Sequence, residues 1–159
     1  MAQFSRTQEI LFNYQLMELK SFSYGKMKRL TIFGNEKRVE VEVFCSDGTP
    51  HILRLNIPPD FPESCPSMDV IAPDGILRKR DHSLLGFASP QDHVLSSQDG
   101  YTRISHNLFR NKTLLQVIEN GWVWLEAYEM HLREGGSIDR FLQELATVLH
   151  AEVTVPHEL

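Results

Sequence analysis

The segment His93–Ser105 gathers side chains that could carry out acyl transfer. The hydroxyl of Thr102 or Ser105 would become a nucleophile if a neighbouring base took its proton. His93 and His106 are the histidines close by in the sequence. Arg103 lies among them, but a guanidinium group keeps its proton and is neither a nucleophile nor a base. The segment therefore supports chemistry only if a histidine lies beside a hydroxyl, which the sequence leaves open.

The two cysteines, Cys45 and Cys65, are the other candidate nucleophiles. Cys45 continues the apolar alternation of the stretch 39–43, so we expect it to be buried in the core and unreactive. Cys65 lies in the proline-rich stretch 58–66, where a thiol can be exposed. Neither cysteine belongs to a Cys-x-x-Cys pair, and no two histidines show the spacing of a helical metal site. We therefore expect no disulfide framework and no metal site.

The composition is that of an ordinary globular domain, which we expect to cover residues 1–159. The net charge is -5, and the densest basic stretch is only Arg78–Arg80. Nucleic acid is therefore an unexpected partner, because phosphate binding requires clustered basic residues. No apolar run approaches the ~20 residues of a membrane span, and the first ten residues lack the plan of a signal peptide. We accordingly expect a cytoplasmic protein without a membrane partner.

Helices are predicted at both ends of the chain. The first covers residues 5–20, begins at a capping box of Ser5 and Gln8, and would pack Ile10, Leu11, Tyr14 and Met17 on a sheet. A long helix begins at Asn111 or Thr113 and runs to about residue 134, where Gly135 and Gly136 end it. A last helix covers residues 137–149.

Four strands are predicted between these helices, at residues 29–33, 39–43, 52–57 and 68–71. They form an antiparallel meander, with a tight hairpin turn at Asp47-Gly48. A long connection of weak periodicity covers residues 73–99. The fold class is therefore α+β, with an N-terminal helix, a four-stranded antiparallel meander, a long loop and C-terminal helices.

This order of elements resembles the ubiquitin-conjugating enzyme superfamily. The stretch Phe61-Pro62-Glu63-Ser64-Cys65-Pro66 is similar to the aromatic-Pro-x-x-Pro-Pro motif that follows the third strand in that family. His93 and Gly100 match the histidine of a His-Pro-Asn motif and the glycine after it. In that register the asparagine falls on Leu95 and the catalytic cysteine falls on Arg103. Because the stretch from Phe61 to His93 is about twice as long as in compact eukaryotic members, His82 is a second candidate for the histidine.

The C-terminal half adds to this resemblance. Phe109 stands where the family has a tryptophan before its next helix. Tyr128-Glu129, Leu132 and Gly135 are similar to a pattern in bacterial members, which belong to ubiquitin-like conjugation systems, many of them linked to antiphage defence. The resemblance implies that His93 orders its loop by hydrogen bonding.

The resemblance implies a noncatalytic or atypical subunit that binds a ubiquitin-like protein, its activating enzyme, or both, because an arginine cannot form a thioester. Two alternatives stay open. The first is an active carrier that uses Cys65, Thr102 or Ser105 in place of the missing cysteine. The second is a protein-interaction module of the related RWD type.

Overall fold

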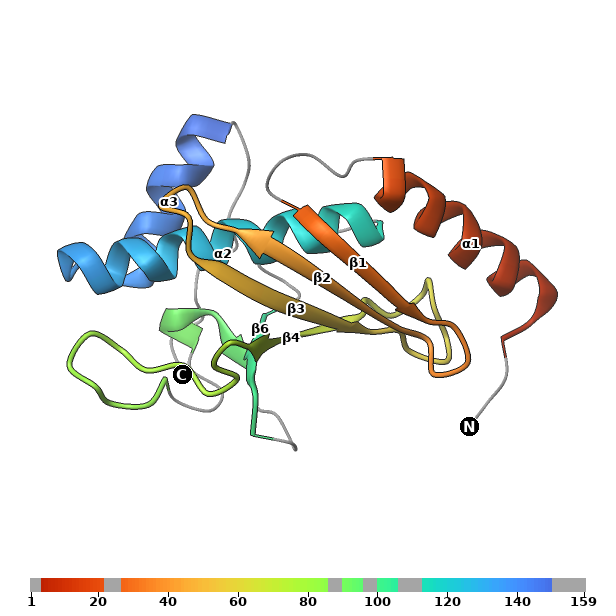
Figure 1. Ribbon diagram of the computed structural model, residues 1–159, viewed down its shortest axis with the longest axis horizontal. Coiled ribbons are helices and arrows are strands. Elements are labelled where there is room, and N and C mark those ends of the chain that lie inside the picture. Colours follow the sequence, from red (N-terminus) through yellow and green to blue (C-terminus); the bar gives the residue numbers. More distant parts are fainter. Residues whose placement is uncertain (1–3, 22–26, 86–89, 96–99, 106–112, 150–159) are drawn as a thin grey trace.

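The computed structural model describes residues 4–21, 27–85, 90–95, 100–105 and 113–149 (Figure 1). It confirms an α+β fold with an N-terminal helix, an antiparallel sheet and C-terminal helices. The elements in chain order are α1 (Arg6–Ser21), β1 (Met27–Phe33), β2 (Arg38–Phe44), β3 (Pro50–Asn56), β4 (Ser67–Ala72), a 3₁₀ turn η1 (Pro90–Asp92), β5 (Val94–Leu95), β6 (Thr102–Ile104), α2 (Leu114–Glu134) and α3 (Ile138–Leu149).

The sheet has six strands in the order β1-β2-β3-β4-β6-β5, and every pair is antiparallel. The predicted meander accounts for the first four strands, so the expected number of strands was too low. The two additional strands have two and three residues. Such short strands cannot show the alternation by which a strand is recognised in a sequence. The expected long loop also contains η1, β5 and an isolated bridge between Arg78 and Leu84.

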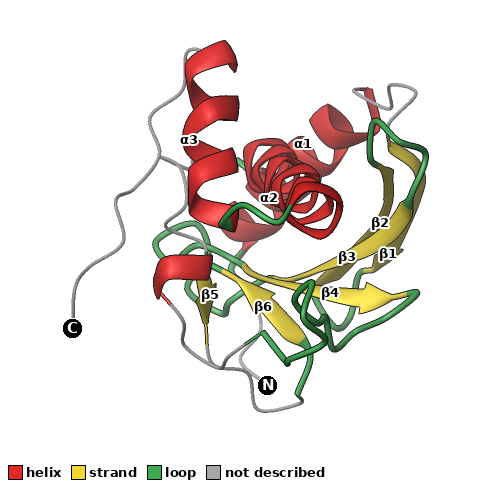
Figure 2. Cartoon of the chain, turned by 90° about the vertical axis from the view of Figure 1, so that its left-hand side faces the viewer, coloured by secondary structure: helices red, strands yellow, loops and turns green. Residues whose placement is uncertain are grey.

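The helices cover one face of the sheet, where the core lies (Figure 2). Along β2 and β3 the burial alternates, so that one face of each strand is enclosed and the other is partly open. Helix α2 packs across the enclosed face and α3 packs on α2. Trp124 and Leu125 of α2 are completely buried. The hairpin turn at Asp47-Gly48 is confirmed, because Gly48 has a φ of 89° and donates its N–H to the carbonyl of Cys45.

The ends of α2 match the predicted signals. Thr113, rather than Asn111, is the N-cap: its hydroxyl accepts from the N–H of Gln116, whose side chain accepts in return from the N–H of Thr113. Gly135 ends the helix with a φ of 85° in the left-handed region. Asn111 lies outside the described residues, as do His106 and Phe109.

Helix α1 begins at the predicted capping box, in which Ser5 and Gln8 bond to each other. Of the four residues expected to pack on the sheet, Leu11 packs against the core, but the other three do not. Ile10, Tyr14 and Met17 are 62%, 67% and 66% exposed. The buried apolar residues of α1 are instead Phe12, Leu16 and Leu19.

Two glutamines also anchor the buried side of α1. Gln8 donates to the carbonyls of Pro59 and Phe61, and Gln15 accepts from the N–H of Leu114 at the start of α2. Both glutamines lie on the inner face of α1 beside Phe12, Leu16 and Leu19, which have the i, i+4, i+7 spacing of a helical apolar stripe. No helix in the described part of the chain is long and apolar enough to cross a membrane.

Candidate functional site

Arg103 lies on β6, directly opposite Asp69 of β4. Its Nε is 2.7 Å from Asp69 Oδ1 and its Nη2 is 3.2 Å from Oδ2, so the guanidinium group binds both carboxylate oxygens. Arg54 of β3, which is opposite Asp69 on the other side, donates Nη2 to Oδ2 at 3.1 Å. The three residues therefore form one row of charges across three strands.

The Asp69 side chain is fully enclosed, whereas those of Arg103 and Arg54 remain 24% and 16% exposed. Asp69 also accepts from Asn56 at 3.3 Å. A buried carboxylate is stable only when it is paired and hydrogen-bonded. Tyr101 adds an aromatic face, because the Arg54 guanidinium lies 5.0 Å from the centre of its ring. Arg103 therefore has a structural partner that holds β6 against β4.

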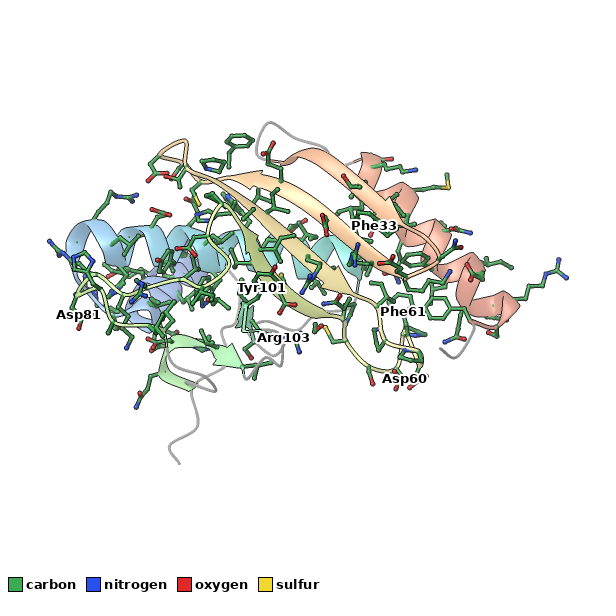
Figure 3. All side chains as sticks on the ribbon, turned by 60° about the horizontal axis from the view of Figure 1, so that its bottom comes forward. Phe33, Asp60, Phe61, Asp81, Tyr101 and Arg103 are labelled. Carbon is green, nitrogen blue, oxygen red and sulfur yellow. The ribbon has the colours of Figure 1, made fainter. Side chains whose placement is uncertain are left out.

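This row of charges lies on the face of the sheet turned away from α2. Met68 and Val70, the neighbours of Asp69 along β4, are buried in the core, so alternation directs Asp69 to the other face. Figure 3 shows Tyr101 and Arg103 near the middle of the molecule, with Asp81 and Phe61 toward its opposite ends.

His93 lies in the turn between η1 and β5, with a φ of 57° in the left-handed region. Its ring is buried, and its Nε2 is 2.8 Å from Asp139 Oδ1 at the start of α3. Its carbonyl accepts from the N–H of Ser105 at 2.9 Å. Trp124 secures the same turn by donating to the carbonyl of Asp92. His93 thus joins the β5–β6 pair to the C-terminal helices.

The candidate hydroxyls differ in their surroundings. Thr102 is only 7% exposed, and its Oγ1 accepts from the N–H of Leu77 at 3.0 Å. Ser105 is partly buried, and the structure brings its backbone to His93. The imidazole of His93 bonds to Asp139. His82, the second candidate histidine, is exposed in the loop 78–84, far along the chain from these hydroxyls.

The two cysteines occupy separate places. Cys45 is buried, as expected from its phase in β2, at the start of the hairpin turn. Burial, together with the negative charges of Glu126 and Glu129, raises the pKa of the Cys45 thiol far above its usual range. Cys65 is partly buried in the proline-rich loop and packs against the core. Because the thiolate is the nucleophilic form, Cys45 is not an activated nucleophile.

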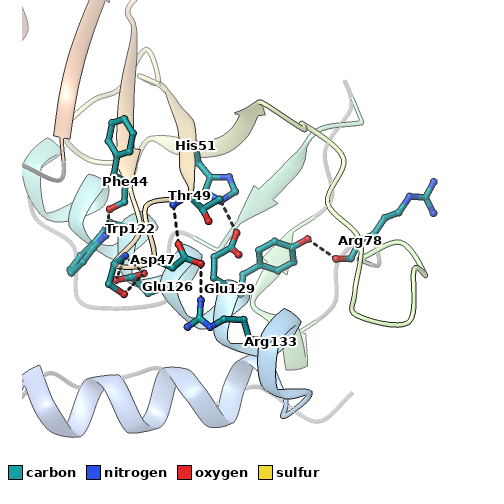
Figure 4. A network of polar contacts seen from close by, with 11 residues as sticks. Phe44, Asp47, Thr49, His51, Arg78, Trp122, Glu126, Glu129 and Arg133 are labelled. Atoms are coloured by element: carbon teal, nitrogen blue, oxygen red, sulfur yellow. Dashed lines mark hydrogen bonds and ion pairs between the residues drawn. The ribbon is translucent and has the colours of Figure 1, made fainter.

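A polar network between the β2–β3 hairpin and α2 was missed in the sequence (Figure 4). His51 Nε2 is 3.0 Å from Glu129 Oε1, and both side chains are at least nine-tenths buried. Around this pair, Glu126 accepts from the N–H of Ser46, and Trp122 donates to the carbonyl of Phe44. Further contacts join Arg133 to Asp47, and Tyr128 to the carbonyl of Arg78.

The alternation of residues along β3 could have predicted that His51 belongs to a buried polar network. His51 alternates with Leu53 and Leu55, which places it on the core face, and a buried histidine requires a polar partner. A thiol, an imidazole and a carboxylate on one face resemble the parts of a nucleophilic site. The two glutamates, however, oppose thiolate formation at Cys45. The network is therefore suited to holding the hairpin on α2.

An open hollow of about 300 Å³ lies at the C-terminal end of α2, lined by Lys79, Arg80, Asp81, His131 and Gly135. His131 accepts from the N–H of Arg80 at 3.1 Å, and its Nδ1 is 2.7 Å from the carbonyl of Gly136. Lys79 pairs with Asp92 at 3.1 Å. Much of the polar lining is thus occupied by contacts within the chain. Among the described residues, no three histidine, cysteine or acidic side chains are arranged to hold a metal ion.

Comparison of the chain with models of protein families gave no match, and comparison with curated proteins gave none.

Proposed function

We propose that this chain is a noncatalytic, ubiquitin-conjugating-enzyme-like subunit that binds a ubiquitin-like protein, its activating enzyme, or both. The observation that carries the proposal is the ion pair between Arg103 and Asp69. In the register of the resemblance, Arg103 takes the place of the cysteine that would carry the thioester. A guanidinium group bound to an enclosed carboxylate offers no nucleophile there.

The β5–β6 pair supports this register. Leu95 and Arg103 are opposite each other in the ladder, and they stand where the family has its asparagine and its cysteine. Both chemical groups of the transfer reaction would therefore be missing at one place. His93 and Gly100, the positions that match, both have positive φ, at 57° and 81°. The long helix α2 that comes after them is the element that the resemblance implies at this point of the chain.

The order of elements also supports the proposal. A helix, three antiparallel strands, a proline-rich loop, a fourth strand, a long connection and a long helix follow in the order that the resemblance implies. In this proposal the protein works in the cytoplasm of a bacterium and needs no cofactor, because ATP-dependent activation belongs to a separate enzyme.

The proposal is tested by incubating the protein with a ubiquitin-like protein, its activating enzyme and ATP, all from one genome, followed by intact mass measurement without reductant. We expect binding in calorimetry and no covalent adduct. The variant Arg103→Cys should accept a thiol-sensitive adduct, and Arg103→Ser is the matched control that should not accept a thiol-sensitive one.

Other outcomes support the alternatives. An adduct on the unmodified chain that thiols remove would indicate a carrier that uses Cys65. An adduct that survives thiols but yields to hydroxylamine would indicate Thr102 or Ser105. A partner that is neither a ubiquitin-like protein nor an activating enzyme would indicate an RWD-type interaction module.

A further inference from the structure

Helix α1 carries an apolar stripe, formed by Ile10, Tyr14 and Met17, that the described part of the chain leaves open. At about 100° per residue, these three side chains fall within roughly 60° of one another around the helix. Each is more than 60% exposed, so the stripe is continuous over nearly two turns. Contiguous apolar surface of this kind in a protein marks a site of association.

The two borders of the stripe differ in charge. On one side Glu9 is paired with Lys37 at 2.6 Å. On the other side Glu18, four residues after Tyr14, lies near enough to Glu119 of α2 for its charge to act on that carboxyl group. Burial and the charge of Glu18 raise the pKa of the Glu119 carboxyl group above its ordinary value. Within the described residues, neither Glu18 nor Glu119 has an ion-pair partner.

The Glu18 carboxylate also has an incomplete set of hydrogen bonds. Its Oε1 is buried and has no hydrogen-bond partner among the described residues. Two neighbouring carboxylates repel, and a buried carboxylate oxygen without a donor is unfavourable. A cation placed between Glu18 and Glu119 would remove both penalties.

We propose that the stripe Ile10, Tyr14 and Met17, together with the Glu18–Glu119 pair, docks a protein partner segment that carries a lysine or arginine beside apolar side chains. The inference rests on the proposed protein-binding function and names the chemistry of the partner. Apolar contact with the stripe supplies the buried area. The basic side chain determines position, because it is the group that matches the unpaired carboxylates.

The test uses two synthetic amphipathic peptides with the same apolar residues, one with lysine and the other with glutamate at its polar positions. Binding to the isotope-labelled protein is followed by NMR at low salt. We expect the basic peptide to shift the signals of α1 and of Glu119, and the acidic peptide to bind at least tenfold more weakly. The double substitution Glu18→Gln and Glu119→Gln should weaken the basic peptide about tenfold. Glu134→Gln, which removes the same charge at the far end of α2, should change its affinity less than twofold.

Tyr14→Ser separates the apolar contribution and should weaken both peptides, without unfolding the domain, because Tyr14 is exposed. Equal binding of the two peptides, or shifts that lie away from α1, would overturn the proposal. So would a dimer of the protein that Tyr14→Ser disrupts, or binding to anionic vesicles in place of the peptide. No ubiquitin-like protein takes part in this experiment, so its failure is distinct from a failure of the proposed function.

Discussion

Replacing Asp69 by asparagine should destabilise the protein much more than replacing Arg103, its closest partner. Asp69 is fully enclosed and accepts four contacts, two of them from Arg103, one from Arg54 and one from Asn56. Asp69→Asn leaves two guanidinium groups without their shared counter-ion. Removing one partner of a buried ion pair destabilises a protein by about 3–5 kcal/mol. This is a large part of the ~5–15 kcal/mol by which domains are stable.

Arg103→Met should have a smaller effect, because Asp69 keeps its contacts with Arg54 and Asn56. The loss of hydrogen bonds to a charged group, partly offset by the apolar side chain, should reduce the stability by about 1.5–3 kcal/mol. Urea unfolding followed by circular dichroism gives both values. The effects should persist in 1 M salt, since buried pairs are screened little.

Arg133→Met is the matched control, because its pair with Asp47 lies at the surface, with side chains 47% and 30% exposed. Its effect should be below about 1 kcal/mol. The reasoning would be refuted if Arg103→Met destabilised the protein as much as Asp69→Asn, or if Asp69→Asn had no larger effect than the control.

Three further outcomes are expected. Native protein should be alkylated at Cys65 well before Cys45, whose thiol is buried and has a raised pKa; equal rates in a mass-spectrometric time course would contradict this. Glu129→Ala should reduce the stability by about 1–3 kcal/mol in urea unfolding because it leaves the buried His51 imidazole without its hydrogen-bond partner, and an effect below about 0.5 kcal/mol would show that the contact is dispensable. A carboxyl group with a raised pKa binds its proton more tightly in the folded state, so Glu119 destabilises the folded protein as the pH rises above the ordinary glutamate range. Glu119→Gln should therefore stabilise the protein by about 0.5 kcal/mol at pH 7 and have no effect at pH 3. A gain of equal size at both pH values would count against repulsion between Glu119 and Glu18.

The parts of the fold that were predicted correctly have local causes. The capping box at Ser5, the cap of α2 at Thr113 (one of the two residues expected), the turn at Asp47-Gly48 and the end of α2 at Gly135 each depend on residues within a few positions. The burial of Cys45 follows from simple alternation along β2. In each case the chain contains the cause of the structure within one element.

The parts that were missed depend on contacts between distant segments. The packed face of α1 carries the apolar stripe Phe12, Leu16 and Leu19, but it also carries the polar Gln8 and Gln15, whose backbone partners in the proline-rich loop and in α2 the sequence does not reveal. The pairing of Arg103 with Asp69 requires the register of β4 on β6, and β6 is too short to be recognised alone. His51 and Glu129 are 78 positions apart, so nothing in the sequence near either residue indicates their pairing.

The attachment of the β2–β3 hairpin to α2 has a consequence for the order of folding. The hydrogen bond between Ser46 and Glu126 joins residues 80 positions apart. Contacts of such long range close large loops, and they form only after much of the chain has already collapsed. The tip of a hairpin ordinarily frays, but here the amide proton of Ser46 is held by the carboxylate of Glu126. Its exchange with deuterium should therefore be slower than that of an unbonded turn amide, and Glu126→Ala should remove this protection.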